Sequence, residues 1–221
     1  GVVGCQMFQT YVYYHDRIEV DPSNSWTGLC PALKGAKYTY IENVTAPQIT
    51  ALFEYAMPDA VITLDDRPVV SIEQTQMNPS GHNIPQRFSF QVRAAELGVP
   101  SILYYPEFSR RTFSDPNVRY LQVRVPLAQR RLSELYDVPA LSVFWPTDSR
   151  TKLPDTRQSA HQGMANVVGA LVYNAGSKNT LLHLPEIKNV LANMDRAVSK
   201  YTKYRHSRYR QNPSVRKFFH N

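Results

Sequence analysis

The chain has 221 residues, of which 43% are hydrophobic and 19% are charged, a composition typical of one packed domain with an appendage. No apolar run reaches 18 residues and no segment resembles a signal peptide, so we expect no membrane partner. The two cysteines, Cys5 and Cys30, are too few for a disulfide framework. We therefore expect free thiols in an intracellular, cytoplasmic protein of prokaryotic type.

The net charge of +7 is concentrated at one end of the sequence. Residues 196–221 contain eight of the 25 Lys and Arg and no acidic residue, which leaves 17 basic against 18 acidic residues before them. Cations neutralise phosphates, and the aromatic residues interleaved with them can stack on bases. This segment therefore predicts a nucleic-acid-binding tail, with a solvated tail as the alternative. The basic residues that we take as candidates are Lys200, Lys203, Arg205, Arg208 and Arg210.

The first 44 residues indicate a β-rich N-terminal element. An aromatic, β-leaning run covers residues 6–15, and a second strand is expected in the sequence KYTYIENV. A helix is then expected to begin with Thr45 as its N-terminal cap and to end at Pro58.

A β-hairpin follows in residues 59–76, with its turn at Asp65 and Asp66. A helix is expected over residues 83–97, closed by Gly98, and a buried strand in PSILYYP.

The rest of the chain continues the alternation of helix and strand. A helix in VPLAQRRLSELYD precedes a strand in ALSVFWP, and two further helices are expected near residues 159–174 and 185–201. A hairpin followed by strands joined through helices predicts an α/β fold, with a mixed β-sheet flanked by helices. We assign residues 45–195 to this core and residues 196–221 to the tail.

Two carboxylates are placed by the hairpin. Asp59 begins the first strand, and Glu73 lies on the second strand among apolar residues. The strand period of two puts Ser71, Glu73 and Thr75 on one face. A carboxylate in an apolar strand is costly unless it is paired or metal-bound. Two converging carboxylates suit Mg²⁺, with Mn²⁺ as a substitute, because this ion prefers hard oxygen ligands.

The pattern of Pro58-Asp59 and Ile72-Glu73-x-Thr75-Gln76, with thirteen residues between Asp59 and Glu73, resembles the PD-(D/E)xK nuclease superfamily. The resemblance covers roughly residues 45–105 and implies the αβββαβ core of restriction endonucleases. It implies that Asp59 and Glu73 hold the metal, which polarises the scissile phosphate and activates the attacking water. The lysine of the motif falls at position 75, which is Thr. Gln76 would take its role if a small bulge turned it inward, and otherwise Thr75 faces the site.

Flanking residues extend the resemblance. Glu54, five residues before Asp59, is similar in position to an extra acidic metal ligand, with an exposed helix carboxylate as the alternative. Gln86 and Phe90 resemble a Gln-x-x-x-Tyr feature that follows the motif in some recombination nucleases. This implies that Gln86 or Arg87 contacts a phosphate or orients a water.

Other basic residues have weaker assignments. Arg93 lies two helical turns past Gln86 and could face the same side. The alternative for this helix is capping by Asn83 and a solvated Arg. The pair Arg110-Arg111 is interpreted as surface charge that could instead line a DNA groove.

These features predict a Mg²⁺-dependent endonuclease acting on double-stranded DNA. A small chain without an ATP-binding loop suits a type II restriction or phage-defence enzyme, which usually acts as a homodimer. A catalytically degenerate nucleic-acid-binding module is the alternative of another class, favoured by the missing lysine. A repair or RNA-processing nuclease of the same superfamily is the third hypothesis.

Overall fold

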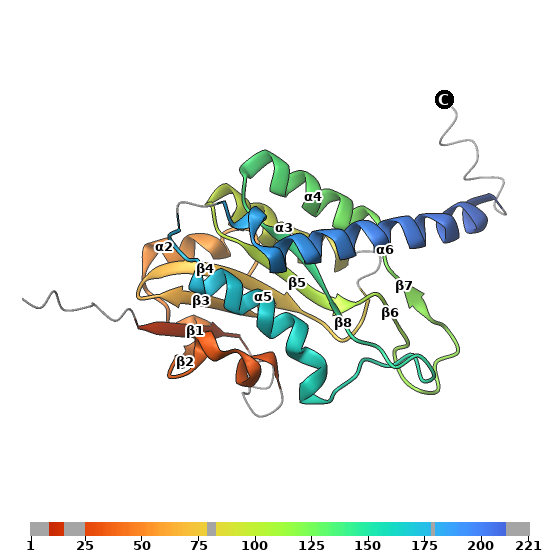
Figure 1. The fold of residues 1–221 in the computed structure, drawn as a ribbon, viewed down its shortest axis with the longest axis horizontal. Coiled ribbons are helices and arrows are strands. Elements are labelled where there is room, and N and C mark those ends of the chain that lie inside the picture. Colours follow the sequence, from red (N-terminus) through yellow and green to blue (C-terminus); the bar gives the residue numbers. More distant parts are fainter. Residues whose placement is uncertain (1–8, 16–24, 79–82, 178–179, 211–221) are drawn as a thin grey trace, which may run out of the picture.

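A six-stranded mixed β-sheet with helices on both faces forms the centre of the molecule (Figure 1). The computed structural model describes residues 9–15, 25–78, 83–177 and 180–210, without the side chains of residues 83–86 and 203–210. This architecture confirms the α/β class with a mixed sheet flanked by helices. Within the described residues, no helix is long and apolar enough to cross a membrane.

The sheet has the strand order β2-β1-β3-β4-β5-β8. Its strands are β1 (Thr10–Tyr14), β2 (Lys37–Tyr40), β3 (Ala60–Leu64), β4 (Arg67–Gln74), β5 (Ser101–Pro106) and β8 (Ala140–Trp145). β3 pairs antiparallel with β1 and β4, whereas β1 pairs with β2, β4 with β5, and β5 with β8 in parallel. A separate two-stranded sheet contains β6 (Phe108–Ser109) and β7 (Arg119–Tyr120).

The α-helices are α2 (Pro47–Thr50), α3 (Asn83–Glu96), α4 (Arg124–Tyr136), α5 (Gln162–Tyr173) and α6 (Pro185–Arg210). Short 3-10 helices are η1 (Trp26–Leu29), η2 (Pro31–Leu33), η3 (Ile41–Asn43), η4 (Ala51–Phe53), η5 (Gln158–His161) and η6 (Leu181–His183). The helix predicted over residues 83–97 is confirmed as α3, and Gly98 after it has a left-handed backbone with φ of 68°.

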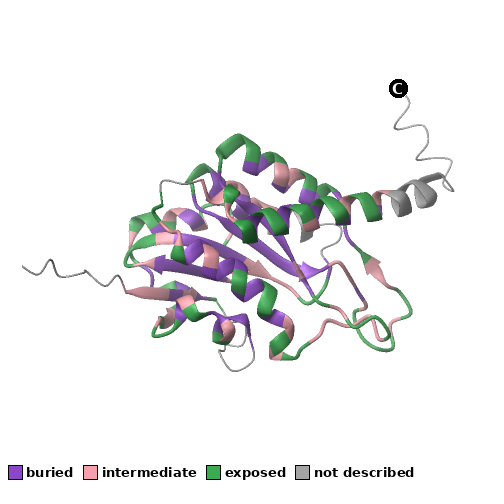
Figure 2. Cartoon of the chain, viewed as in Figure 1, coloured by how far each residue is buried: buried purple, intermediate pink, exposed green. Residues whose placement is uncertain are grey.

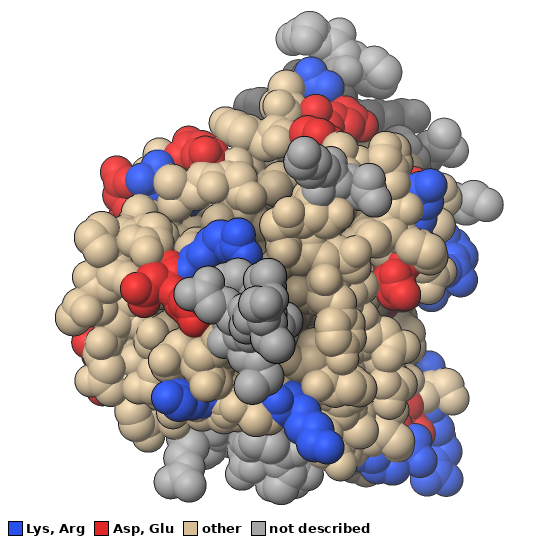
Figure 3. Space-filling view, turned by 60° about the vertical axis from the view of Figure 1, so that its left-hand side comes forward, with Lys and Arg blue, Asp and Glu red and all other residues tan. Residues whose placement is uncertain are grey.

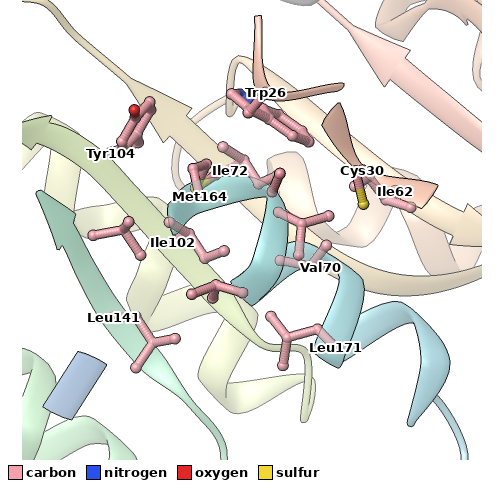
Figure 4. Close-up of a cluster of buried hydrophobic side chains, with 14 of the residues drawn as sticks. Trp26, Cys30, Ile62, Val70, Ile72, Ile102, Tyr104, Leu141, Met164 and Leu171 are labelled. Carbon is pink, nitrogen blue, oxygen red and sulfur yellow. The ribbon is translucent and has the colours of Figure 1, made fainter. Parts of the chain in front are cut away.

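The larger hydrophobic core lies between α5 and one face of the sheet. Ile72, Ile102 and Leu141 from three neighbouring strands point toward Met164 and Leu171 of α5 (Figure 4). All six residues of β5 are buried, because this central parallel strand is covered on both faces. Figure 2 shows the same layering, with buried strands inside and exposed outer sides of the helices.

The opposite face of the sheet is covered by α3, α4 and the α2-η4 segment, while α6 packs along the edge strand β8. A buried polar network ties these elements together. Gln129 of α4 donates to Gln91 of α3 at 2.7 Å and accepts from Ser142 of β8 at 2.6 Å. Because these buried groups have partners, the polar residues stiffen the helix layer rather than destabilise it.

The two strands expected within residues 1–44 are confirmed as β1 and β2, which form one edge of the main sheet, and Trp26 and Cys30 join the core beside α5. The expected start of the next helix is wrong. Thr45 is not the helix cap: the cap position is Ala46, without a side-chain hydrogen bond. The helix is short, since α2 passes into the 3-10 turn η4 directly after Thr50.

The cysteines are only partly covered by the structure. Cys30 is a free, buried thiol, as expected from the sequence, whereas Cys5 lies outside the described residues. Burial raises the pKa of the Cys30 thiol, so this side chain is a packing residue of the core.

The expected boundary between the core and a C-terminal tail at residue 196 is also wrong. α6 runs without interruption across the expected boundary at residue 196, and Ala197 and Tyr201 are buried against the body of the protein. Tyr201 is therefore a core residue and not a free stacking ring. The backbone of residues 203–210 continues α6. Residues 211–221 lie outside the described part, as do the side chains of the candidates Lys203, Arg205, Arg208 and Arg210.

Candidate metal centre

Asp59 and Glu73 meet at one end of the β3-β4 hairpin. Ala60 pairs with Ile72 in the antiparallel register, so the next position places Asp59 opposite Glu73. Residues directly opposite one another on antiparallel strands have side chains on the same face. Asp59 Oδ2 accepts the backbone N–H of Gln74 at 2.7 Å, which fixes its carboxylate at the end of β4. The two predicted carboxylates are thus brought together.

The Glu73 carboxylate is largely buried, with 13% of its side chain exposed. Its Oε1 accepts from Arg87 Nη1 at 2.6 Å. Burial, reinforced by the negative charge of Asp59, raises the pKa of Glu73 to about 7, and Arg87 offsets only part of this rise. The pair therefore carries more negative charge than Arg87 compensates when both carboxylates are ionised, which favours a further cation.

Helix α3 positions Arg87 over Glu73. Phe90 and Ala94, three and seven residues after Arg87, are buried, so this side of the helix faces the sheet. Arg87 lies in the early turns of α3, where the helix begins near the end of β4. The side chain of Gln86 lies outside the described residues, so its predicted role stays a prediction.

Thr75 and Gln76, the two residues expected to replace the lysine of the motif, both lie beyond the end of β4. Thr75 continues beyond β4, its N–H donating to the Tyr104 carbonyl at 2.9 Å, and its Oγ1 accepts the N–H of Met77 at 3.2 Å. Gln76 lies two residues past the end of β4 and is exposed. The register shift of the hairpin lies between Ile62 and Thr63, so it does not turn Gln76 toward the carboxylates.

Glu54 and Arg93 form a contact of their own. Arg93 Nη2 lies 2.5 Å from Glu54 Oε2, and its Nε donates to the Ala51 carbonyl at 3.0 Å. The Glu54 side chain is 58% exposed, and the described residues contain no group of three His, Cys, Asp or Glu arranged to hold a metal. The structure thus uses Glu54 and Arg93 to tie α3 to the α2-η4 segment, and does not bring Glu54 to the Asp59-Glu73 pair.

His15 lies beside the site, although no sequence pattern selected it. Its backbone N–H donates to the Asp59 carbonyl at 2.8 Å, at the end of β1. The sequence did not indicate this contact, because β1 and β3 are about 45 residues apart along the chain. They are brought together by their antiparallel pairing in the sheet. A polar residue directly after an aromatic strand was the only local hint.

Among the candidate basic residues of the C-terminal segment, the structure describes the side chain of Lys200. Lys200 Nζ lies 3.1 Å from Glu107 Oε2, so α6 is fastened to the segment after β5. On the face shown in Figure 3, the described Lys and Arg form separate groups divided by uncharged residues.

No protein-family model matches the chain, and neither a curated protein nor a solved structure is significantly similar to it.

Proposed function

We propose that this protein is a Mg²⁺-dependent endonuclease that hydrolyses phosphodiester bonds of double-stranded DNA, built on a restriction-endonuclease-like core. One observation carries the proposal: Asp59 and Glu73 lie opposite one another at the end of adjacent strands, partly buried, with Arg87 in contact with Glu73. The order α2, β3, β4, α3 and parallel β5 supports part of that core, but only two strands lie between α2 and α3 in the described residues where the αβββαβ pattern has three.

The residues present fit Mg²⁺ better than a metal held entirely by protein ligands. Mg²⁺ is commonly bound through one or two carboxylates and keeps several waters or substrate phosphate oxygens. The N–H of Gln74 orients the Asp59 carboxylate through Oδ2, and Arg87 orients the Glu73 carboxylate through Oε1. When bound, the metal would polarise the scissile phosphate and lower the pKa of the attacking water.

Arg87 is the cation that compensates for Thr75 in this proposal. It reaches the site from α3, whereas the lysine of the motif would have come from β4. Its guanidinium neutralises Glu73 before substrate binds, and it can donate to a phosphate oxygen at the same place. A restriction or phage-defence role and a homodimer, which would cut both strands, are part of the proposal.

A degenerate DNA-binding module is the second candidate function. It is favoured by Thr75, whose hydroxyl accepts a local backbone N–H rather than supplying positive charge. The two candidates differ in whether the bound metal leads to cleavage, and a repair or RNA-processing nuclease differs in its preferred substrate.

The decisive experiment measures metal binding and cleavage on the same samples. Calorimetry would follow Mg²⁺ and Mn²⁺ binding, and gels would follow long duplex DNA, single-stranded DNA and RNA with Mg²⁺, with Ca²⁺ or with chelator. We expect cleavage of duplex DNA with Mg²⁺ only. Glu73→Gln should lower both metal binding and cleavage about 100-fold, because it removes one of two charged ligands.

The matched control is Glu134→Gln, which changes an exposed carboxylate paired with Arg131 on α4. This variant should bind metal and cleave as the unmodified protein does. Metal and DNA binding without cleavage would favour the degenerate module. Absence of metal binding that depends on Glu73 would reject the proposed function, and preference for single strands or RNA would move it to repair or RNA processing.

A further inference from the structure

Two loops leave the sheet at the same end as the candidate metal centre. β4, β5 and β8 are parallel, so their carboxyl ends lie on one side of the sheet, where Glu73 is found. The loop of residues 110–118 joins β6 to β7 directly after β5, and residues 146–157 follow β8. In open α/β sheets, ligands bind outside the carboxyl ends of the strands.

The base of the 110–118 loop is anchored close to the carboxylates. Asn78 Nδ2 donates to the carbonyls of Pro106 and Glu107 at 2.8 and 3.0 Å, and its N–H donates to Ser109 Oγ at 3.1 Å. Asn78 lies five positions after Glu73 in the chain, which limits the distance between their Cα atoms to about 17 Å.

The second loop holds the first in place. Arg110 N–H donates to the Lys152 carbonyl at 2.8 Å, and Thr147 Oγ1 donates to the Phe108 carbonyl at 3.1 Å. Lys152 Nζ also lies over the Phe108 ring at 5.4 Å from its centre. The 110–118 loop therefore projects from a supported base.

The tip of this loop presents an aromatic ring to solvent. The N–H of Asp115 donates to the Thr112 carbonyl at 3.1 Å, which closes a turn with Phe113 at its outer corner. Phe113 is 71% exposed, the largest value among the large hydrophobic residues that the structure describes. Arg111 beside it is also exposed.

Exposure alone would not distinguish Phe113, because single exposed apolar residues are common on protein surfaces. Tyr173 is almost as exposed, at 69%, and it ends α5 at the opposite end of the sheet, near the amino ends of β4 and β5. The difference is position: Phe113 combines an exposed ring, a neighbouring cation, a closed turn and a base fixed at the same end of the sheet as the candidate metal centre.

We propose that the 110–118 loop is a DNA-engaging wedge, in which Phe113 stacks against a base step of the duplex and Arg111 contacts an adjacent phosphate. Apolar side chains that insert in this way unstack the step and bend the DNA, while the cation supplies affinity. The wedge rests on the proposed function, since it takes the same duplex that the Asp59-Glu73 centre would cut.

The test places a fluorescent reporter at the tip. The two native Trp residues are buried, with exposed fractions of 1% for Trp26 and 7% for Trp145, so an added surface Trp gives a separable signal. Phe113→Trp and the control Tyr173→Trp would be titrated with long duplex DNA in Ca²⁺. We expect DNA to quench the added fluorescence of the Phe113→Trp variant and to shield it from acrylamide, and to leave the control variant unchanged.

Binding and cleavage complete the test. Phe113→Ala should weaken duplex binding about tenfold, because one base-aromatic stacking contact is lost, whereas Tyr173→Ala should not. If both Trp reporters respond alike, or if Phe113→Ala binds and cleaves as the unmodified protein does, the wedge is rejected and the nuclease assignment stands. If the unmodified protein does not bind duplex DNA, both proposals are rejected.

Discussion

Glu73 and Arg87 show how individual residues of the site depend on one another. A carboxylate in a buried strand is stable only with compensation, and Arg87 provides it at 2.6 Å from α3. Sequence patterns selected both residues but could not show that they touch, because they lie on different elements. In the proposed function, their contact takes the place of a cation on the strand at Thr75.

Arg87→Ala should destabilise the metal-free protein by about 1–2 kcal/mol at pH 8, because the largely buried Glu73 carboxylate loses the cation that it contacts. The partial exposure of Arg87, 28%, keeps this value below that of a fully buried pair. Urea unfolding in chelator measures the change. Arg131→Ala, which removes an exposed cation, is the control and should change stability by less than about 0.5 kcal/mol. Equal effects would contradict the assigned role of Arg87.

Cleavage by the same variants tests the catalytic part of that role. Arg87→Lys retains the charge and should keep measurable activity, whereas Arg87→Ala should lose it while still binding Mg²⁺. If Arg87→Ala cleaved normally, the charge would have to come from another residue.

His161 is a buried residue of the core. It is 3% exposed, its Nδ1 lies 2.8 Å from the Tyr104 hydroxyl, and its ring meets Trp145 edge-on. Burial lowers the pKa of His161 below its usual 6.5, although the nearby charge of Asp155 opposes this. The histidine is therefore best explained by packing and hydrogen bonding.

This pKa direction predicts an acid-sensitive contribution to stability. Below pH 6.5 the unfolded chain binds a proton at His161 that the folded protein does not, so the free energy of unfolding falls as pH decreases toward the folded pKa. His161→Gln should show a smaller loss between pH 7.5 and pH 5 in urea unfolding. The same pH dependence in both proteins would refute this contribution.

At the scale of elements, α6 crosses the boundary that the sequence suggested between core and tail. Its basic composition suggested a tail, but Ala197 and Tyr201 pack with Leu103 and Tyr105 of β5. Tyr201 also donates to Glu107 at 3.1 Å, and its ring lies 5.9 Å from that of Tyr120 in β7. Residues 196–202 are therefore part of the fold.

Tyr201→Ala should consequently destabilise the protein by about 3 kcal/mol, as expected for the loss of a buried aromatic side chain. Thermal or urea unfolding measures this value. Tyr173→Ala removes an exposed ring from α5 and should change stability by less than about 0.5 kcal/mol. A small effect at Tyr201 would show that α6 is dispensable beyond residue 196.

At the scale of the whole molecule, the parallel strands bring separate features to one side of the sheet. Glu73 on β4, the 110–118 loop after β5 and residues 146–157 after β8 are far apart in the chain, but they share the carboxyl ends of these strands. The candidate metal centre and the proposed DNA-engaging loop are thus neighbours because of sheet topology.

The sequence by itself determined the type of most elements and which pair of acidic residues would meet. The alternation of helices and strands predicted the mixed sheet. The short hairpin brought Asp59 and Glu73 together because its turn at Asp65 and Asp66 lies midway between them. These outcomes depend on local periodicity and turn chemistry, which the sequence records directly.

Only the tertiary structure decided which residues from distant parts of the chain contact one another around this hairpin. The placement of β1 beside β3, the approach of Arg87 to Glu73 and the pairing of Glu54 with Arg93 all depend on how elements pack. The same holds for the burial of Tyr201. The physical reason is that strand order and helix packing are set by hydrophobic contacts across the whole chain, whereas a local pattern specifies only which face of each element is apolar.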